Sequence, residues 1–191
     1  MFVAGASGVI STRLLPLLAE AGHEVAGMTR SPEKAPLIEE RGGTPVVCDV
    51  FDPPALRAAL VDFRPDAVVD ELTDLPDERE RLHEFEAAND RMRREGTRNL
   101  LDAAAAAKAP RFVAQSIAWE LPDERGGAVA ELEQMVLDAG GVVVRYGQLY
   151  GPGTFYESDC PDPPRVHVDD AAERTADLLE ARSGVVTVTD D

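Results

Sequence analysis

Two glycines and a serine near the start of the chain have the types and spacing of a phosphate-binding loop. Gly5 and Gly8 lie between a short apolar run, residues 1–4, and an amphipathic run that begins near Val9. Gly5 permits a tight turn, Gly8 lets the backbone approach a pyrophosphate, and free N–H groups at the helix start face that phosphate. Ser11 stands where glycine or alanine usually packs the helix on the strand, so we expect serine there at a modest cost. An ordinary strand–turn–helix is the alternative. The predicted cofactor contacts of the loop are Gly5, Ser7, Gly8, Val9 and Ile10.

Arg30 stands 22 residues after Gly8, directly after the second predicted strand. An acidic residue at this place holds the ribose hydroxyls of NAD, whereas an arginine binds the 2′-phosphate of NADP. The sequence therefore predicts NADP as the cofactor, with NAD as the alternative. Arg30 could also be an ordinary surface arginine with no role in binding. Further predicted cofactor contacts are Ser31, Asp49 and Val50, with Asp49 placed to accept from the adenine amino group.

Short apolar runs alternate with longer amphipathic ones, which indicates how these residues are positioned. Ser31 before Pro32 has the form of a capped helix start, Asp170 with Glu173 resembles a capping box, and Gly96 divides or bends a long helix. Strands are predicted at residues 1–4, 25–28, 45–48, 67–69, 111–117, 142–145 and 185–188, and helices at 53–61, 78–107, 129–139 and up to about residue 181. The alternation implies an α/β fold of the Rossmann type, a doubly wound parallel sheet in a single domain over residues 1–191.

The composition narrows the classes of partner. The chain is 44% apolar, enough for a core, and its net charge of −17 repels phosphate, so nucleic acid and anionic membranes are poor partners. The two cysteines, Cys48 and Cys160, do not indicate a disulfide framework, and the three histidines lack the spacing of metal ligands, so no metal is expected. The chain has no apolar run of about 18 residues, and the expected compartment is the cytoplasm.

Six short motifs lie in order along nearly the whole chain. They are residues 2–8 (FVAGASG), 48–52 (CDVFD), 95–100 (EGTRNL), 111–116 (RFVAQS), 144–152 (VRYGQLYGP) and 166–170 (VHVDD). Together they resemble the motifs of extended or atypical short-chain dehydrogenases/reductases, of the NAD(P)-dependent epimerase/dehydratase family. The resemblance implies a Rossmann sheet with NAD(P) across its carboxyl edge and a small-molecule substrate. It also implies that Leu72 and Thr73 line the adenosine half of the site.

The sequence departs from this family in two ways. The family's catalytic tyrosine and lysine stand four residues apart, but no tyrosine here is followed by a lysine at that distance. Ser116 is the only hydroxyl near the position of the family's catalytic serine, and a hydrogen-bonded core serine is an equal alternative. The usual substrate segment is cut to residues 153–165, so residues 146–191 form a reduced substrate-side region. The protein is either naturally shortened or the chain omits segments of a longer one.

Several side chains are candidates for chemistry, each with a simpler reading. Arg145 would bind an anionic substrate group and Tyr150 would donate a proton, unless both only pack a loop of the family. Ser116, Tyr150 and Arg145 are the predicted catalytic residues. His167 and Asp169 could be a catalytic base with a carboxylate that orients it, or they could only form a structural turn. Asp70 and Glu71 could be an acid/base pair, or they could be carboxylates on the solvated surface. Trp119 could form a wall of the nicotinamide pocket, or it could belong to the core.

The favoured function is an NADP-dependent oxidoreductase, or a redox-assisted epimerase/dehydratase, acting on a small metabolite. The alternatives are a non-catalytic NADP(H)-binding sensor or scaffold, and a cofactor-independent acid–base enzyme on the same fold. Residues 78–107 and 129–139 carry apolar side chains on two faces, among them Leu82, Phe85, Met92, Leu132 and Val136. We expect the second face to form a four-helix bundle across a two-fold axis in a homodimer.

Overall fold

The structure, a computed structural model, describes residues 1–121 and 123–190 of the 191-residue chain. Seven parallel strands form the main sheet in the order β3-β2-β1-β4-β5-β6-β9. The order reverses between β1 and β4, as in a doubly wound Rossmann sheet. The strands are β1 (Phe2–Ala4), β2 (Ala26–Thr29), β3 (Thr44–Val47), β4 (Val68–Asp70), β5 (Phe112–Ile117), β6 (Val142–Tyr146) and β9 (Gly184–Val188). Each predicted strand is therefore confirmed, with ends that differ by at most one residue.

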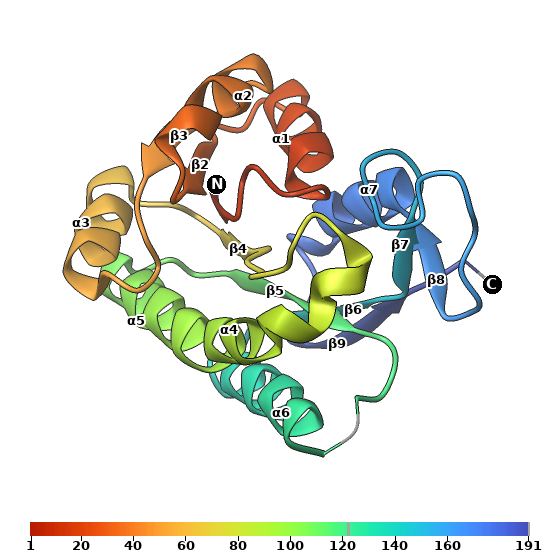
Figure 1. The fold of residues 1–191 in the computed structure, drawn as a ribbon. Coiled ribbons are helices and arrows are strands. Elements are labelled where there is room, and N and C mark those ends of the chain that lie inside the picture. Colours follow the sequence, from red (N-terminus) through yellow and green to blue (C-terminus); the bar gives the residue numbers. More distant parts are fainter. Residues whose placement is uncertain (122, 191) are drawn as a thin grey trace.

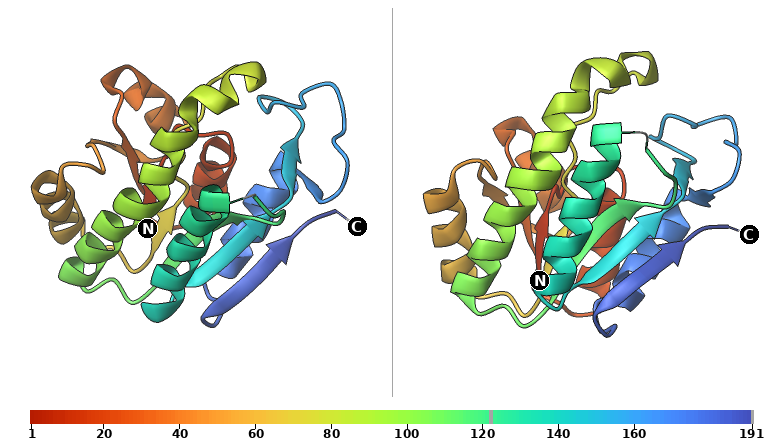
Figure 2. Two further views of the ribbon diagram at one scale, coloured as in Figure 1. Left: turned by 60° about the horizontal axis from the view of Figure 1, so that its bottom comes forward. Right: turned by 90° about the horizontal axis from the view of Figure 1, so that it is seen from below.

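Helices cover both faces of this sheet (Figure 1). One face carries α1 (Ser11–Glu20), α2 (Ala35–Glu40) and α7 (Val168–Leu178); the other carries α3 (Pro53–Phe63), α4 (Glu86–Arg91), α5 (Thr97–Ala107) and α6 (Asp123–Asp138). Figure 2 shows α5 and α6 running side by side across their face of the sheet. The sheet is thus the middle layer of three, which confirms the predicted fold class.

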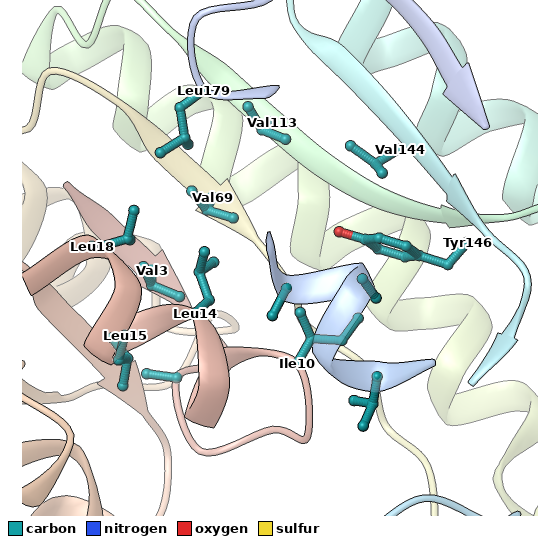
Figure 3. Packing of buried hydrophobic residues seen from close by; sticks show 14 of the residues in the cluster. Val3, Ile10, Leu14, Leu15, Leu18, Val69, Val113, Val144, Tyr146 and Leu179 are labelled. Carbon is teal, nitrogen blue, oxygen red and sulfur yellow. The ribbon is translucent and has the colours of Figure 1, made fainter. Parts of the chain in front are cut away.

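The core consists of two layers because successive strand residues point to opposite faces. Phe2 and Ala4 of β1 belong to the cluster under α3, α5 and α6, whereas Val3 belongs to the cluster under α1 and α7. Figure 3 shows the cluster under α1 and α7. Tyr146 lies among the aliphatic side chains of this cluster, and the hydroxyl of Tyr146 points toward β4. At the carboxyl ends of β4 and β5 the buried side chains include three polar ones, those of Asp70, Glu71 and Ser116.

Three local predictions differ from the structure. The stretch predicted as one helix at 78–107 is a 3₁₀ helix (η2, Arg79–Phe85), then α4, a π-helical turn (η3, Met92–Gly96) and α5. Gly96 thus marks an irregular turn, as predicted. The capping box of α7 is wrong, because the helix begins at Val168 and the side chain of His167 accepts from the N–H of Asp169. Ser31 precedes a 3₁₀ turn (η1, Pro32–Lys34), but its side chain makes no capping hydrogen bond.

The reduced substrate-side region has a structure that the sequence did not predict. Strands β7 (Gln148–Tyr150) and β8 (Arg165–His167) pair in parallel as a small second sheet, and the loop 151–164 connects them. This sheet lies beside the carboxyl end of β6 (Figure 1). Among the described residues, no helix is long and apolar enough to cross a membrane.

Candidate cofactor and active site

The glycine loop lies at the carboxyl end of β1, between β2 and β4. Gly5 has a φ of +79°, and a Cβ there would lie 2.7 Å from the backbone oxygen of Glu71. Only glycine adopts this conformation readily and fits this space. Gly8 is exposed, and its N–H donates to the oxygen of Gly5 at 2.9 Å. The loop is a tight turn that presents bare backbone at the start of α1.

Contacts with β2 hold this loop in place. The N–H of Ala6 donates to the oxygen of Met28 at 2.9 Å, and Oγ of Ser7 lies 3.4 Å from Oγ1 of Thr29. Val9 is half-buried, whereas Ile10 is buried in the core and offers a ligand only its backbone. The residues present fit the pyrophosphate of NAD(P), because an open backbone cradle faces the positive end of the α1 dipole.

Ser11, the third position of the glycine pattern, is the first residue of α1 and is fully buried. Its Oγ has no hydrogen-bond partner within the described part of the chain. An unsatisfied buried hydroxyl costs about 1–3 kcal/mol. The modest loss of stability that the sequence predicts for serine at this position is therefore explained by the unpaired hydroxyl of Ser11.

Arg30 extends from the end of β2 and forms an ion pair that the sequence did not reveal. Its Nη2 lies 2.8 Å from Oδ1 of Asp74, on the loop after β4, and this hydrogen bond raises the pKa of Arg30. Thr73 is exposed and Leu72 half-buried on the same loop, and Ser31 is half-buried beside Arg30. The charge of Arg30, which the sequence predicts to bind a 2′-phosphate, is thus already engaged by the carboxylate of Asp74.

The remaining predicted adenosine contacts lie after β3. Asp49 is exposed, and its Oδ1 accepts from the N–H of Phe51 at 2.9 Å, which closes a short turn. Val50 is buried in the core beneath this turn, so its side chain does not face the cleft. The guanidinium of Arg91 stacks on the ring of Phe51, with its Cζ 3.8 Å from the ring centroid. Asp49 therefore remains the accessible acceptor that the sequence predicts for adenine.

Asp70 and Glu71 are buried, so the reading as solvated surface carboxylates is wrong. Asp70 accepts from Oγ1 of Thr97 and from the N–H of Leu72, both at 3.1 Å, yet burial raises its pKa to about 6. Burial raises the pKa of Glu71 further, to about 8. As neighbours on a strand end, the two carboxyls point to opposite faces of the sheet. They therefore do not form the acid/base pair considered from the sequence.

Burial makes Glu71 a neutral acid near pH 7, although it accepts a hydrogen bond. The hydroxyl of Tyr146 donates to Oε1 of Glu71 at 3.0 Å and lies 2.5 Å from Oγ1 of Thr175, whose hydroxyl donates to the oxygen of Ala171 at 2.6 Å. Burial and the nearby charge of Asp70 raise the pKa of Glu71 to about 8, and the hydrogen bond from Tyr146 lowers it only in part. Within the described part of the chain no cation partners this carboxyl group, so its neutral form is favoured.

Ser116 and Arg145 meet on the opposite face through Glu133, a residue that the sequence reasoning missed. Oε1 of Glu133 accepts from Oγ of Ser116 at 2.6 Å and from Nε of Arg145 at 2.8 Å, and its Oε2 accepts from Nη2 of Arg145 at 2.5 Å. Burial opposes the charge of Glu133, but the hydrogen bonds from Arg145 and Ser116 outweigh burial and lower its pKa. The sequence did contain a signal for this residue: Glu133 is a charged residue that lies between Leu132 and Val136, two inward-facing residues of α6.

Tyr150 does not join Ser116 and Arg145 in these contacts. Its hydroxyl donates to Oδ2 of Asp190 at 2.7 Å, which raises the pKa of Tyr150 to about 12. The ring of His167 lies edge-on to Tyr150, and its Nδ1 accepts from the N–H of Asp169, which fits the structural turn. Trp119 is 36% exposed, so the reading as a core residue is wrong. None of the residues in the described ranges forms a group suited to hold a metal ion.

The glycine cradle at the switch point of a doubly wound sheet defines an NAD(P)-binding Rossmann protein. A family model described as NAD(P)H-binding matches residues 5–140, and the chain belongs to this family. A 3-diazoavenalumate denitrifying reductase from Streptomyces sp. is 36% identical over 234 aligned positions, which cover the whole chain and 76% of the relative. The alignment is longer than the 191-residue chain, so the relative has segments that this chain lacks.

Solved structures with the same fold include epimerases that act on UDP-linked sugars. The UDP-Glc/GlcNAc 4-epimerase of Campylobacter jejuni superposes with a TM-score of 0.81 at 17% identity, over 98% of this chain and 77% of that chain. The UDP-glucose 4-epimerase of Thermus thermophilus, solved with NAD, gives 0.77 at 19% identity, over 98% and 76% of the two chains. These likenesses confirm the Rossmann fold, and this chain spans about three quarters of the length of each of these two epimerase chains.

Proposed function

We propose that this protein is an NADP(H)-dependent reductase of a small electrophilic metabolite. The observation that carries the proposal is the cradle at Gly5, where a Cβ would lie 2.7 Å from the oxygen of Glu71, so that only bare backbone fits. The reductase that is 36% identical over the whole chain supports the reaction class. When bound in this cradle, the cofactor supplies a hydride, and the protein supplies binding and orientation.

Arg30 supports NADP rather than NAD as the cofactor. It stands at the end of β2, where an arginine binds a 2′-phosphate and an acidic residue binds ribose hydroxyls. Its side chain is 56% exposed, so it can turn to meet a ligand. Asp49 accepts from the adenine amino group, and Leu72 and Thr73 line the adenosine on the side of β4.

At the substrate end, Arg145 binds an anionic group of the substrate. Its side chain is 43% exposed, and Glu133 holds only one side of the guanidinium. Ser116 already donates its only proton to Glu133, and Tyr150 donates to Asp190. Both hydroxyls are therefore engaged, and helix α6 contains neither tyrosine nor lysine. We propose a hydride acceptor that needs no proton from the enzyme, which places Ser116 and Tyr150 in positioning roles.

An aryl diazonium cation is such an acceptor, and the Streptomyces relative is named for a diazo-substituted substrate. An aryl diazonium cation that takes up a hydride gives an arene and dinitrogen, and charge and atoms balance without a proton. We therefore favour this acceptor class over ketones and aldehydes, whose reduced oxygen must be protonated. An epimerase/dehydratase, a non-catalytic NADP(H) sensor and a cofactor-independent acid–base enzyme remain the alternatives. The epimerase neighbours are below 25% identity and support the fold only.

Binding and turnover test the proposal separately. Calorimetric titration is expected to show NADPH binding at least about tenfold more tightly than NADH, with most of this preference lost in Arg30→Ala, since a charge-assisted contact is worth about 1.5–3 kcal/mol. Gly8→Val, at an exposed helix start, should fold normally and bind neither. Oxidation of NADPH by an aryl diazonium carboxylate, faster than by a carbonyl library, is expected. Binding without oxidation of NADPH by any acceptor would favour the sensor.

We also propose a homodimer, although its apolar basis is smaller than the sequence suggested. Met92, Leu132 and Val136 are buried within their own chain, while Leu82 and Phe85 are half-buried. Arg94 of η3 pairs with Glu131 of α6 inside one chain. Light scattering at micromolar concentration tests this: a concentration-independent mass near 20.6 kDa would contradict the dimer.

A further inference from the structure

An ion pair crosses the carboxyl edge of the sheet above the glycine loop. Arg30 follows β2 and Asp74 lies after β4, and these two strands flank β1 on either side. Neighbouring strands are about 4.8 Å apart, so the pair spans a gap of about 10 Å over the end of β1. Both oxygens of Asp74 are used, with Nη2 to Oδ1 at 2.8 Å and Nη1 to Oδ2 at 3.4 Å. The carboxylate thus occupies the fork of the guanidinium.

The carboxylate end of this pair is fixed, and the arginine end is free to turn. The N–H of Asp74 donates to Oδ1 of Asn89 at 3.0 Å, and Asn89 is buried on α4. The side chain of Asp74 is only 15% exposed, against 56% for Arg30. Asn89 therefore anchors the backbone of Asp74, and a ligand that competes for the guanidinium meets a negative charge that does not move away.

We propose that Asp74 is a specificity-determining residue, which holds the guanidinium fork of Arg30 that the 2′-phosphate of NADP would use. This inference rests on the proposed function, because it assumes that the adenosine half of NADP lies over the glycine loop. The 2′-phosphate must displace a carboxylate that already pairs with Arg30. Once bound, the phosphate lies close to Asp74, a like charge. Asp74 thus weakens NADP and leaves NAD, which lacks this phosphate, almost unaffected.

A purely structural role for Asp74 predicts the opposite result. If the ion pair only positioned Arg30 or pinned two loops together, removing the charge would weaken the binding of every adenosine ligand or leave it unchanged. The two roles therefore predict opposite changes in the affinity for one ligand group, the 2′-phosphate. Two small probes isolate that group: adenosine 2′,5′-bisphosphate carries it, and adenosine 5′-monophosphate does not.

Calorimetric titration of the full chain with these two probes tests the inference. Asp74→Asn keeps the shape and removes the charge; it should bind the bisphosphate about fivefold more tightly, as expected for one partly screened charge about 5 Å away. Binding of the monophosphate should change by less than about twofold. Asp77→Asn is the matched control, since it removes an exposed charge from the same loop, and it should change neither affinity. In a protein that already carries Arg30→Gln, adding Asp74→Asn should change the affinity for the bisphosphate much less than it does in the parent protein.

The outcomes separate this inference from the proposed function. If the unmodified protein prefers the bisphosphate but Asp74→Asn leaves that preference unchanged or lowers it, the role of Asp74 is wrong and the cofactor proposal stands. If the unmodified protein binds neither probe, the cofactor proposal fails and the inference fails with it. Should Asp74→Asn melt far below the parent protein, Asp74→Ser replaces it, with the same expected direction.

Discussion

Two buried carboxyl groups lie at the same edge of the sheet, on opposite faces, and their protonation states differ. Glu71, under α7, accepts a hydrogen bond from the hydroxyl of Tyr146, and burial raises its pKa to about 8, so it is mostly protonated near pH 7. Glu133, on α6, accepts from the guanidinium of Arg145 and from Ser116, and its pKa is lowered. Burial favours the neutral form of both. The cationic partner of Glu133 makes the difference.

This difference assigns different uses to the two faces. On the face of Glu71 the polar contacts close on themselves, from the carboxyl through Tyr146 and Thr175 to the oxygen of Ala171. On the face of Glu133 they end in Arg145, whose side chain is 43% exposed and therefore reaches solvent and ligands. The first network seals the core near the cofactor loop, and the second presents a positive charge at the edge where substrates bind in such sheets.

The largest expected effect is a pH dependence of stability that comes from Glu71. Its pKa is about 8 when folded and near its ordinary value of 4.5 when unfolded, so the native state holds an extra proton between these values. The free energy of unfolding therefore falls as pH rises through this window, by up to about 1.4 kcal/mol per pH unit, and no further above it. Urea denaturation from pH 5 to 9 should show this fall, and Glu71→Gln should remove it.

Asp70 provides the control for that experiment. Its pKa is raised to about 6 from an ordinary 3.8, so Asp70→Asn should flatten the stability profile only between these lower values. Glu71→Gln should match the parent protein near pH 5 and exceed its stability near pH 8. Equal slopes in the parent protein and in Glu71→Gln would show that the fold does not raise the pKa of Glu71.

Loss of Glu133 should have the next largest effect. Glu133→Ala removes the acceptor of both Ser116 and Arg145, and the buried hydroxyl of Ser116 loses its partner. We expect a loss of about 1–3 kcal/mol in the free energy of unfolding, discounted because Arg145 is partly solvated. Glu133→Gln, which keeps one acceptor oxygen, should lose less. Denaturation at pH 7 measures both, and a fully stable Glu133→Ala would mean that this network contributes nothing to the fold.

Much of this arrangement followed from the sequence, and the part that did not has a physical reason. The glycine loop and the strand ends at Ser116 and Arg145 were predicted because local spacing and strand order decide them. The partners Glu133 and Asp74 were missed because they meet Ser116 and Arg30 only when distant elements pack together. Burial of Glu71 was missed for the same reason: Tyr146, which covers it, is 75 residues away in the chain.

A smaller effect should come from Tyr146→Phe, which tests the sealed network alone. The change removes the hydrogen bond that Glu71 accepts and one of the two contacts of Oγ1 of Thr175, which still donates to the oxygen of Ala171, at a cost of about 1–2 kcal/mol. Since the hydrogen bond from Tyr146 lowers the pKa of Glu71, its loss should carry the pH-dependent fall in stability to higher pH. Tyr156→Phe, which removes a half-buried hydroxyl bound to Gln148, is the control and should leave the pH profile unchanged.

The smallest expected effect is that of Ser116→Ala, which decides between a structural and a catalytic serine. The hydroxyl of Ser116 donates to Oε1 of Glu133, but that carboxylate keeps both contacts with Arg145. The loss in the free energy of unfolding should therefore be about 0.5–1 kcal/mol. Thr97→Val should lose more, because Asp70 is fully buried and keeps only the N–H of Leu72. Because its proton is committed to Glu133, we expect Ser116 to supply none to the substrate, and kcat of the proposed reductase reaction should fall less than about tenfold. A fall of about 100-fold or more in kcat, at unchanged NADPH affinity, is typical of a general acid and would reassign Ser116 as the proton donor.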